Sequence, residues 1–495
     1  MKRFLVYLFA VVFAAVGCTK DYDTESTPGE VNGLLLDAFH TQNEAPQHKV
    51  TSTEILTPEE MAESMFGPDD EIDDEFKAEA KKKFLELCDE KRAELSREDP
   101  DGARAFRFKK LNFSYETVQQ NGGSIWLSAF MGFAIHINDN PYDQNHILFC
   151  CPYTHTYGVE CATRDGGGWE FKTMLSDNLF IMPDGQGFGD DALSVQTYLN
   201  HELHAQQYYD AFRAGYDIYI EDEHGTLEDD WTLRVVGASQ GAGDAIALHK
   251  FLDKNYKRLD LTNYYNEGRR AAADAACRMF GYPKGTKYIE VPLCNIHRFE
   301  YSYVCSGPYC PEATMQTYSR WTKMSYPCVI PLVIKSMISC YPELLKYGGE
   351  EAFFSKEWND NKADFDKLYR EKTMESKKLN RYICLKLGVD EGVPMLPLDK
   401  MLSKEMMDTN SPIYRDLIEC LKKQDLTTDW RPRTRTYLDY TKNDEVVPCE
   451  NTERLVALFK ANNVQCTTAD YSYGGILNVG HVSCCTGYIT SSWDR

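Results

Sequence analysis

The run Trp231-Thr-Leu-Arg-Val-Val-Gly-Ala-Ser239-Gln-Gly241 constrains the fold more than any other part of this chain. An apolar, β-branched stretch leads into a G-x-S-x-G pentapeptide, and a helical pattern follows over residues 244–252. A serine on a sharp turn between a strand and a helix needs small neighbours, because the turn brings backbone segments into close contact. Gly237 and Gly241 meet that need. Because such a pentapeptide also arises by chance, the strand before it and the helix after it carry the prediction.

A carboxylate and a histidine follow in the order that a reactive serine would need. Asp444 comes after a strand pattern at residues 435–441 and before a helical pattern at residues 451–460. His481 is the last histidine of the chain and follows a second strand pattern at residues 465–473. The order serine, aspartate, histidine is one of the three chain orders known for Ser-His-Asp triads.

The chemistry of such a triad assigns each residue a role. His481 would accept the proton of the Ser239 hydroxyl, and Asp444 would hold the imidazole in the correct tautomer. Two alternatives stay open. Asp444 could serve only to cap the following helix, and His481 could be an ordinary loop histidine. Glu445 and Asp470 are the alternative acids.

An oxyanion formed at Ser239 would need two backbone N–H donors. The amide of Gln240 is free to be the first, because it follows the serine at the start of a helix. The second would come from the loop after the strand at residues 146–151, near Thr154 or His155. The alternative for this segment is an ordinary connecting loop.

Five stretches of the chain resemble, in the same order, the secretory-lipase branch of the α/β-hydrolases. The likeness is greatest to large hydrolases that anaerobic Gram-negative bacteria export as lipoproteins, and it covers residues 107–495. The stretches are Phe113-Ser-Tyr115-Glu-Thr117 with Leu127-Ser-Ala129, Tyr153-Thr154, Met182-Pro-Asp184 with Gly187-Phe-Gly189, Gly237-Ala-Ser239-Gln-Gly241, and Ser306-Gly-Pro308-Tyr with Asp444-Glu-Val-Val-Pro448.

The resemblance implies an α/β-hydrolase fold, with a mostly parallel central sheet flanked by helices. It makes Ser239, Asp444 and His481 the catalytic triad and implies acyl transfer through an acyl-enzyme, without metal or organic cofactor. Two positions depart from the family pattern. Pro152 stands where the family often has histidine, and Val-Ser-Cys-Cys follows His481.

Helical patterns over residues 311–429 predict an inserted helical lid between strands six and seven. The α/β core would then comprise residues 107–310 and 430–495. Lids exclude water and shape the pocket for the acyl group. Six large side chains of this segment are candidates for pocket lining, with a role in its own core as the favoured alternative: Tyr318, Trp321, Met324, Met337, Met401 and Met406.

The N-terminus indicates export. Residues 1–18 combine two basic residues, a short apolar stretch and small residues before Cys18, which resembles a bacterial lipoprotein signal with Cys18 as the lipidated residue. The alternative is a plain cleaved signal peptide. Thr19 favours the outer membrane, at its periplasmic face or at the cell surface. We expect residues 19–58 to be a flexible tether and residues 59–106 a charged helical region.

The charge of the chain limits the classes of molecule that it is expected to bind. The net charge of −22, from 54 basic and 76 acidic residues, argues against nucleic acid. We expect a small-molecule or glycan-linked ester as substrate and the membrane as partner through the lipid anchor; the oligomeric state is not predicted.

Disulfides are permitted in an exported chain with 17 cysteines, and Cys305 and Cys310 flank a turn that could be bridged. His201-Glu-Leu-His204 is one residue short of the zinc motif H-E-x-x-H, so no metal site is predicted.

The leading hypothesis is a serine hydrolase that cleaves carboxylic esters, similar to an esterase or a lipase. A carbohydrate esterase and a serine peptidase would use the same triad. From a different class, a lipid-anchored binding protein could retain the fold without activity.

Overall fold

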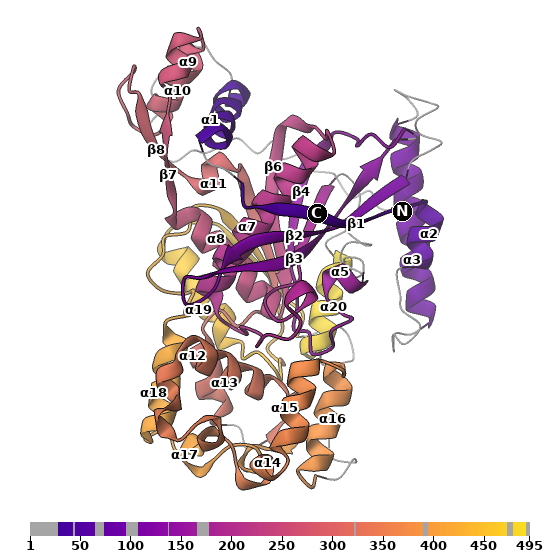
Figure 1. Cartoon of the computed structure of the whole chain (residues 1–495), viewed down its shortest axis with the longest axis vertical. Coiled ribbons are helices and arrows are strands. Elements are labelled where there is room, and N and C mark those ends of the chain that lie inside the picture. Colours follow the sequence, from indigo (N-terminus) through magenta and orange to yellow (C-terminus); the bar gives the residue numbers. More distant parts are fainter. Residues whose placement is uncertain are drawn as a thin grey trace, which may run out of the picture.

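The structure is a computed structural model, drawn whole in Figure 1. It describes residues 28–42, 45–64, 74–95, 107–136, 138–165, 178–320, 323–389, 395–472 and 479–491. The expected signal segment, with Cys18, lies outside these residues. Among the helices of the described residues, none combines the length and the apolar character that crossing a bilayer would need.

Nine strands of the described residues form one sheet in the order β1-β2-β3-β5-β4-β6-β9-β12-β13. From β5 to β13 neighbouring strands are parallel, whereas β1, β2 and β3 are joined by antiparallel pairings. The mostly parallel sheet expected from the sequence is therefore confirmed. The strands are β1 (His48–Leu56), β2 (Arg107–Val118), β3 (Ser124–Ile135), β4 (Gln144–Cys151), β5 (Asn178–Pro183), β6 (Leu227–Ala238), β9 (Phe299–Cys305), β12 (Arg435–Tyr440) and β13 (Cys466–Asp470).

Alternate residues of the central strands enter two separate cores. In β4, Phe149 and Cys151 pack into one core, whereas Leu148 and Cys150 pack into the other, because successive side chains of a strand point to opposite faces. Both faces are covered, which explains the continuous apolar run of this strand. The first core lies under α7 (His201–Asp217), α8 (Gln240–Lys254) and α19 (Glu450–Ala461), and the second under α2 (Pro58–Glu63), α3 (Asp74–Leu95), α5 (Ala162–Asp165) and α20 (His481–Ser491).

The helices α2 and α3 fall within the charged N-terminal segment. Thr57 accepts a hydrogen bond from the amide of Glu60, and the Glu60 carboxylate accepts one from the amide of Thr57, so the two residues form a capping box that starts α2. From α3 the side chains of Phe84 and Cys88 are buried against the sheet.

The flexible tether expected over residues 19–58 is wrong wherever the structure describes that segment. Residues Pro28–Gln42 form helix α1, and β1 extends the sheet beside β2. The polar composition of the segment hid an apolar stripe at helical spacing. Its members are fully or almost fully buried: Val31, Leu34, Leu35, Ala38 and Phe39.

A second feature that was not anticipated lies between α8 and β9. The antiparallel pair β7 (Tyr256–Asp260) and β8 (Tyr288–Pro292) carries α9 (Thr262–Asn266), α10 (Arg270–Met279) and α11 (Leu293–Ile296). Figure 1 shows α1 beside this unit at one end of the molecule, and their apolar residues share the first core. The short 3₁₀ helix η1 (Gly189–Asp191) precedes α7 in the chain, and the π-helix η2 (Ile218–Asp222) follows it directly.

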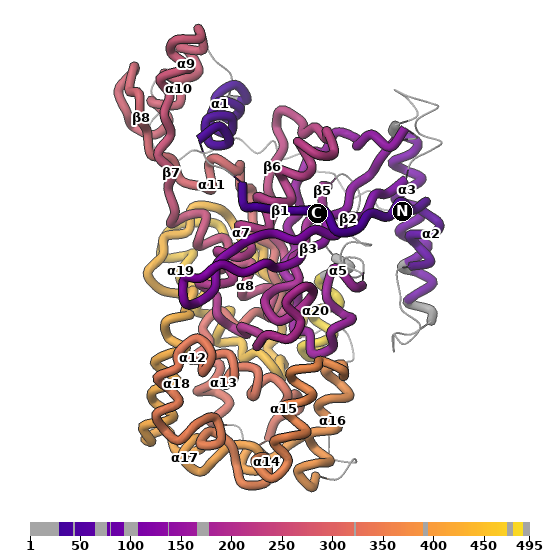
Figure 2. Tube along the Cα trace, viewed as in Figure 1, coloured from indigo at the N-terminus to yellow at the C-terminus, as the bar shows by residue number. Residues whose placement is uncertain are grey.

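The inserted segment is largely helical and lies at the opposite end of the molecule (Figures 1 and 2). It lies between the sixth and seventh strands of the sheet if counting starts at β2, and the unexpected strand β1 raises both numbers by one. Its elements are α12 (Pro311–Tyr318), β10 (Lys323–Met324), α13 (Val329–Cys340), η3 (Pro342–Tyr347), η4 (Glu350–Phe353), α14 (Lys356–Asp360), α15 (Lys362–Glu371), α16 (Ser376–Lys386), β11 (Leu396–Pro397), η5 (Leu398–Lys400), α17 (Lys404–Met407) and α18 (Pro412–Lys422).

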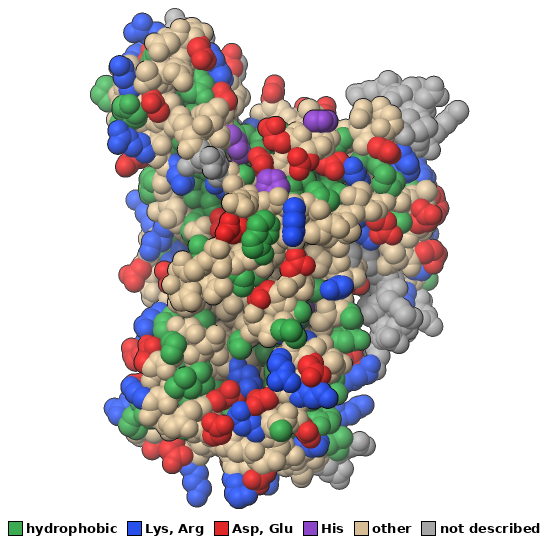
Figure 3. Space-filling model, in the orientation of Figure 1, with side chains coloured by type: hydrophobic (Ala, Val, Ile, Leu, Met, Phe, Trp, Pro, Cys, Tyr) green, Lys and Arg blue, Asp and Glu red, His purple; other side chains and the backbone are tan. Residues whose placement is uncertain are grey.

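The insertion has a hydrophobic core, to which the sheet domain contributes only Tyr198 and Leu199 among the buried residues described. Four of the six candidate pocket-lining residues are buried within that core, which is the alternative that the sequence favoured: Met324, Met337, Met401 and Met406. Tyr318 is also buried and donates a hydrogen bond to the carbonyl of Val446, 2.5 Å away. Trp321 lies outside the described residues. On the face drawn in Figure 3, acidic and basic side chains are interspersed over the insertion and the sheet domain alike.

Replacing Phe39 tests whether α1 is a packed helix and not a flexible tether. Phe39 is fully buried, and its ring meets that of His297 edge to face at 5.2 Å between centroids. We expect Phe39→Ala to lower the free energy of unfolding in urea by about 3–5 kcal/mol, because the change leaves a cavity in the core. Thr41→Ala is the matched control on the same helix, since Thr41 is exposed and its hydroxyl donates to carbonyls of α1. Equal stability of the two variants would mean that residues 28–42 are a tether after all.

Candidate active site

Ser239 lies on a tight turn between β6 and α8. Its φ of +54° and ψ of −123° are unusual for a residue with a side chain, as expected of a serine held on a strained turn. A Cβ atom on Gly237 would lie 2.2 Å from the carbonyl oxygen of Gly241, and one on Gly241 would lie 2.2 Å from that of Cys151. Both positions therefore require glycine, as the pentapeptide predicted.

The structure brings Ser239, His481 and Asp444 together. Nε2 of His481 is 2.9 Å from Oγ of Ser239, and Nδ1 is 2.7 Å from Oδ2 of Asp444. The histidine is the first residue of α20, and the aspartate lies in the loop between β12 and α19. The three residues come from distant parts of the chain, and all three follow strands of the parallel part of the sheet.

Asp444 is oriented by its own loop. Its Oδ1 accepts hydrogen bonds from the amides of Val446 at 2.9 Å and Val447 at 2.6 Å, which leaves Oδ2 facing the imidazole. Neither alternative acid is placed on the ring. Glu445 accepts a hydrogen bond from the backbone amide of His481, and Asp470 pairs with Lys442.

His481 is buried, and its pKa is raised well above 6.5. Burial by itself lowers the pKa, because it disfavours the imidazolium, but the negative charges of Cys485 and Asp444 outweigh that effect. The Cys485 sulfur is 3.9 Å from Nε2, the nitrogen that faces Ser239. An imidazole between a carboxylate and a serine hydroxyl can take the hydroxyl proton while the carboxylate stabilises the imidazolium.

Two residues near His481 gain a position only from the structure: Tyr488, which no sequence pattern singled out, and Cys485, the last residue of the unusual Val-Ser-Cys-Cys run. Cys485 and Tyr488 lie on α20, four and seven residues after His481. The Tyr488 hydroxyl accepts a hydrogen bond from the amide of Gly237 and donates one to the carbonyl of Tyr303, so it joins α20 to β6 and β9. A helical pattern recognised after His481 would have placed both residues near its face.

Two of the three predicted oxyanion residues line one small cavity. Gln240 and His155 both line it, together with Pro152 and Gln196. Thr154 is on the same loop, and its hydroxyl lies 3.2 Å from that of Tyr198. The close approach of Gly241 to the end of β4 is what brings the two segments together.

The insertion is attached to this loop at several points. The hydroxyl of Thr156 donates to the carbonyl of Met374 at 2.9 Å, and the amide of Gly158 donates to the carbonyl of Lys372 at 2.7 Å. The ammonium group of Lys372 donates to the carbonyl of Ala192 at 2.9 Å. The first two bonds connect the segment between α15 and α16 to the loop that carries Thr154 and His155, and the third connects the same segment to the residue that follows η1.

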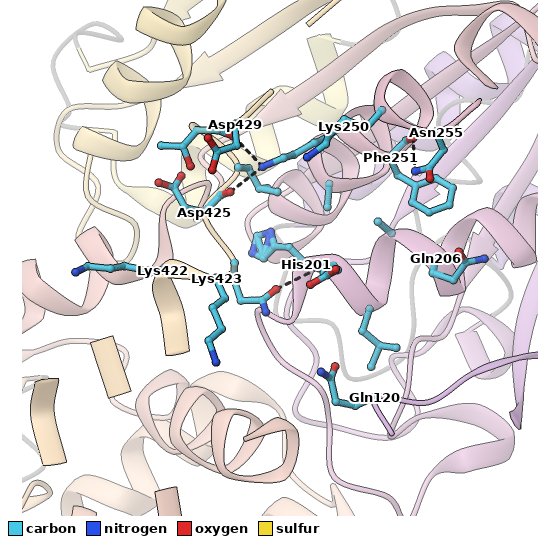
Figure 4. A pocket seen from close by; sticks show the side chains of 18 of the residues that line it. Gln120, His201, Gln206, Lys250, Phe251, Asn255, Lys422, Lys423, Asp425 and Asp429 are labelled. Carbon is cyan, nitrogen blue, oxygen red and sulfur yellow. Dashed lines mark hydrogen bonds between the residues drawn. The ribbon is translucent and has the colours of Figure 1, made fainter. Parts of the chain in front are cut away.

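The two histidines of His201-Glu-Leu-His204 have different surroundings. His204 lies between Asp244 and Thr197, with 2.8 Å to each, and is buried. His201 is also buried, and it lines a pocket of about 750 Å³ between the sheet domain and the insertion, which Lys250 lines as well (Figure 4). Among the described residues, no group of three or more histidine, cysteine, aspartate or glutamate side chains is placed to hold a metal ion.

No family model matches the chain, and no curated protein sequence is similar to it. Solved structures are similar in fold. The rice cell wall degrading esterase LipA from Xanthomonas oryzae gives a TM-score of 0.59 at 15% identity, over 90% of this chain and 97% of that one. A protein from Legionella pneumophila gives 0.58 at 15% identity, over 90% and 96%. Candida antarctica lipase A gives 0.47 at 11% identity, over 78% of each chain.

The identities are low, so these similarities concern the fold. They agree with the order and direction of the strands and with the helices on both faces of the sheet. The resemblance expected from the sequence is confirmed at that level: the chain has the α/β-hydrolase fold.

Proposed function

We propose that this protein is a serine hydrolase that cleaves carboxylic esters through an acyl-enzyme on Ser239. The observation that carries the proposal is the continuous hydrogen-bonded series from Asp444 through His481 to Ser239, which ends on the strained turn. The similarity in fold to a cell wall degrading esterase supports the same chemistry by analogy.

In the proposed reaction, Oγ of Ser239 attacks the ester carbonyl carbon while its proton passes to Nε2 of His481. The imidazolium then protonates the departing alkoxide, so that an alcohol leaves and the acyl group stays on the serine. Water attacks the acyl carbon in the second half, with His481 again accepting the proton. Backbone amides of Gln240 and of Thr154 or His155 would hold the negative oxygen in both halves.

A second Ser-His-Asp set in the same molecule shows why exposure and the turn matter. Oγ of Ser302 is 2.8 Å from Nδ1 of His249, and Nε2 of that ring is 3.3 Å from Asp253. The serine and the histidine are completely buried between β9 and α8, and the serine lies within a regular strand. Ester substrates have no access to it, so Ser302 is a matched control.

Removing the nucleophile tests the proposal. We expect Ser239→Ala to reduce kcat on short p-nitrophenyl esters by about 10⁶-fold, because the triad acts as a unit. A fluorophosphonate should label Ser239 in the parent protein and in Ser302→Ala, and should not label it in His481→Ala. Full turnover by Ser239→Ala would contradict the proposal. Faster cleavage of p-nitroanilides than of esters would identify a peptidase, and a protein that is neither labelled nor active would be a binding protein.

The raised pKa of His481 predicts the pH dependence. The base must be neutral to accept the serine proton, so activity is lost as the pH falls below its pKa. We therefore expect kcat/KM to increase with pH and its acid-limb midpoint to lie above 6.5. In Asp444→Asn the midpoint should move to lower pH, because the imidazolium loses its carboxylate partner, and kcat should fall by about 10³–10⁴-fold. Midpoints that coincide in the two proteins would show that Asp444 does not act on the ring.

A further inference from the structure

Three cysteines, Cys305, Cys484 and Cys485, lie together where α20 meets the end of β9, and one of them, Cys485, lies beside the imidazole of His481. The sulfur atoms of Cys305, at the end of β9, and Cys484 are 3.5 Å apart. Cys485 lies one helical turn after His481, with its sulfur 3.9 Å from Nε2. Cys305 and Cys310, which flank a turn that could have been bridged, are both free thiols, and Cys305 faces α20.

Cys485 combines exposure with an acidic thiol. It is partly exposed, as are Cys449 and Cys466, whereas Cys305 and Cys484 are buried. A hydrogen bond with Cys305 and the charge of the His481 imidazolium lower the pKa of Cys485 to about 6. Burial raises the pKa of Cys449 and raises that of Cys466 to about 11. Thiolates are the nucleophilic form of cysteine, so Cys485 has the properties of a reactive cysteine and the other two do not.

We propose that Cys485 is a modification site for hydroperoxides and thiol-directed electrophiles, and that in its unmodified form it restrains the base His481. The second half of this proposal rests on the proposed function. A thiolate beside Nε2 stabilises the proton on the nitrogen that must be free to accept the proton of Ser239. The other ionisable groups that act on the imidazole are Asp444 beside Nδ1, Glu445 on the backbone amide, and Tyr326 of the insertion.

The oxidation balances without any group of the protein beyond this cluster. The thiolate of Cys485 attacks one oxygen of a hydroperoxide, an S–O bond forms and the O–O bond breaks, which leaves a sulfenic acid and a hydroxide or alkoxide ion. The thiol of Cys305 then attacks the sulfenic sulfur, an S–S bond forms and water leaves. The two sulfur atoms together lose two electrons, which the peroxide gains. Either product removes the negative charge from beside His481.

The rate of alkylation tests the reactivity of Cys485 without requiring enzymatic turnover. We would treat the protein at pH 7 with limiting iodoacetamide and map the modified cysteines by mass spectrometry. We expect Cys485 to react at least about tenfold faster than Cys449 and Cys466, after allowance for the weaker nucleophilicity of an acidic thiol. The advantage should shrink in His481→Ala and persist in Cys449→Ser. Equal rates at the three cysteines would overturn the assignment of the site.

The pH dependence of kcat/KM tests whether Cys485 restrains His481. In Cys485→Ser, which keeps the size of the side chain and loses the charge, we expect the acid-limb midpoint of kcat/KM to shift to lower pH. Parent protein oxidised with hydrogen peroxide should shift in the same direction and return after reduction with dithiothreitol. An unchanged midpoint in Cys485→Ser would overturn the restraint, with Cys449→Ser as the control. Selective alkylation of Cys485 in a protein without esterase activity would contradict the proposed function and leave the modification site intact.

Discussion

The close approach of the turn at Ser239 to the end of β4 is the contact on which the rest of the site depends. No side chain fits at Gly237 or Gly241, because backbone carbonyls occupy the space where a Cβ would be. That approach sets the start of α8, and hence the amide of Gln240, against the loop that carries Thr154. Tyr488 then connects α20 to the same strand, so the helix that begins with His481 is placed relative to the turn itself.

The two Ser-His-Asp sets separate what hydrogen bonding provides from what reactivity needs. Both sets have a serine within 3 Å of an imidazole and an aspartate on the far nitrogen. Around His249 the set fills space in the core, where a buried polar group must find a partner. Around His481 the serine follows the strand on a strained turn and is partly exposed. The geometry of three side chains therefore does not suffice to identify a catalytic site.

The insertion is a packed body that shares its core with the sheet domain. Its methionines and aromatic residues pack in one cluster with Tyr198 and Leu199, and hydrogen bonds of Thr156, Gly158 and Lys372 add polar contacts between the two parts. Because these hydrogen bonds hold the loop that carries Thr154, a movement of the insertion would also shift the backbone amides proposed to bind the oxyanion.

The sequence by itself determined the local features: the glycines around Ser239, the apolar run of β4 and the helical insertion all follow from spacing and residue type. It also contained the apolar stripe of α1, which its polar composition concealed. Only the tertiary structure decided that Asp444, and not Glu445 or Asp470, faces His481, and that a thiol lies beside the same ring. The physical reason is that local patterns specify secondary structure, whereas the order of the strands brings distant residues within hydrogen-bonding distance.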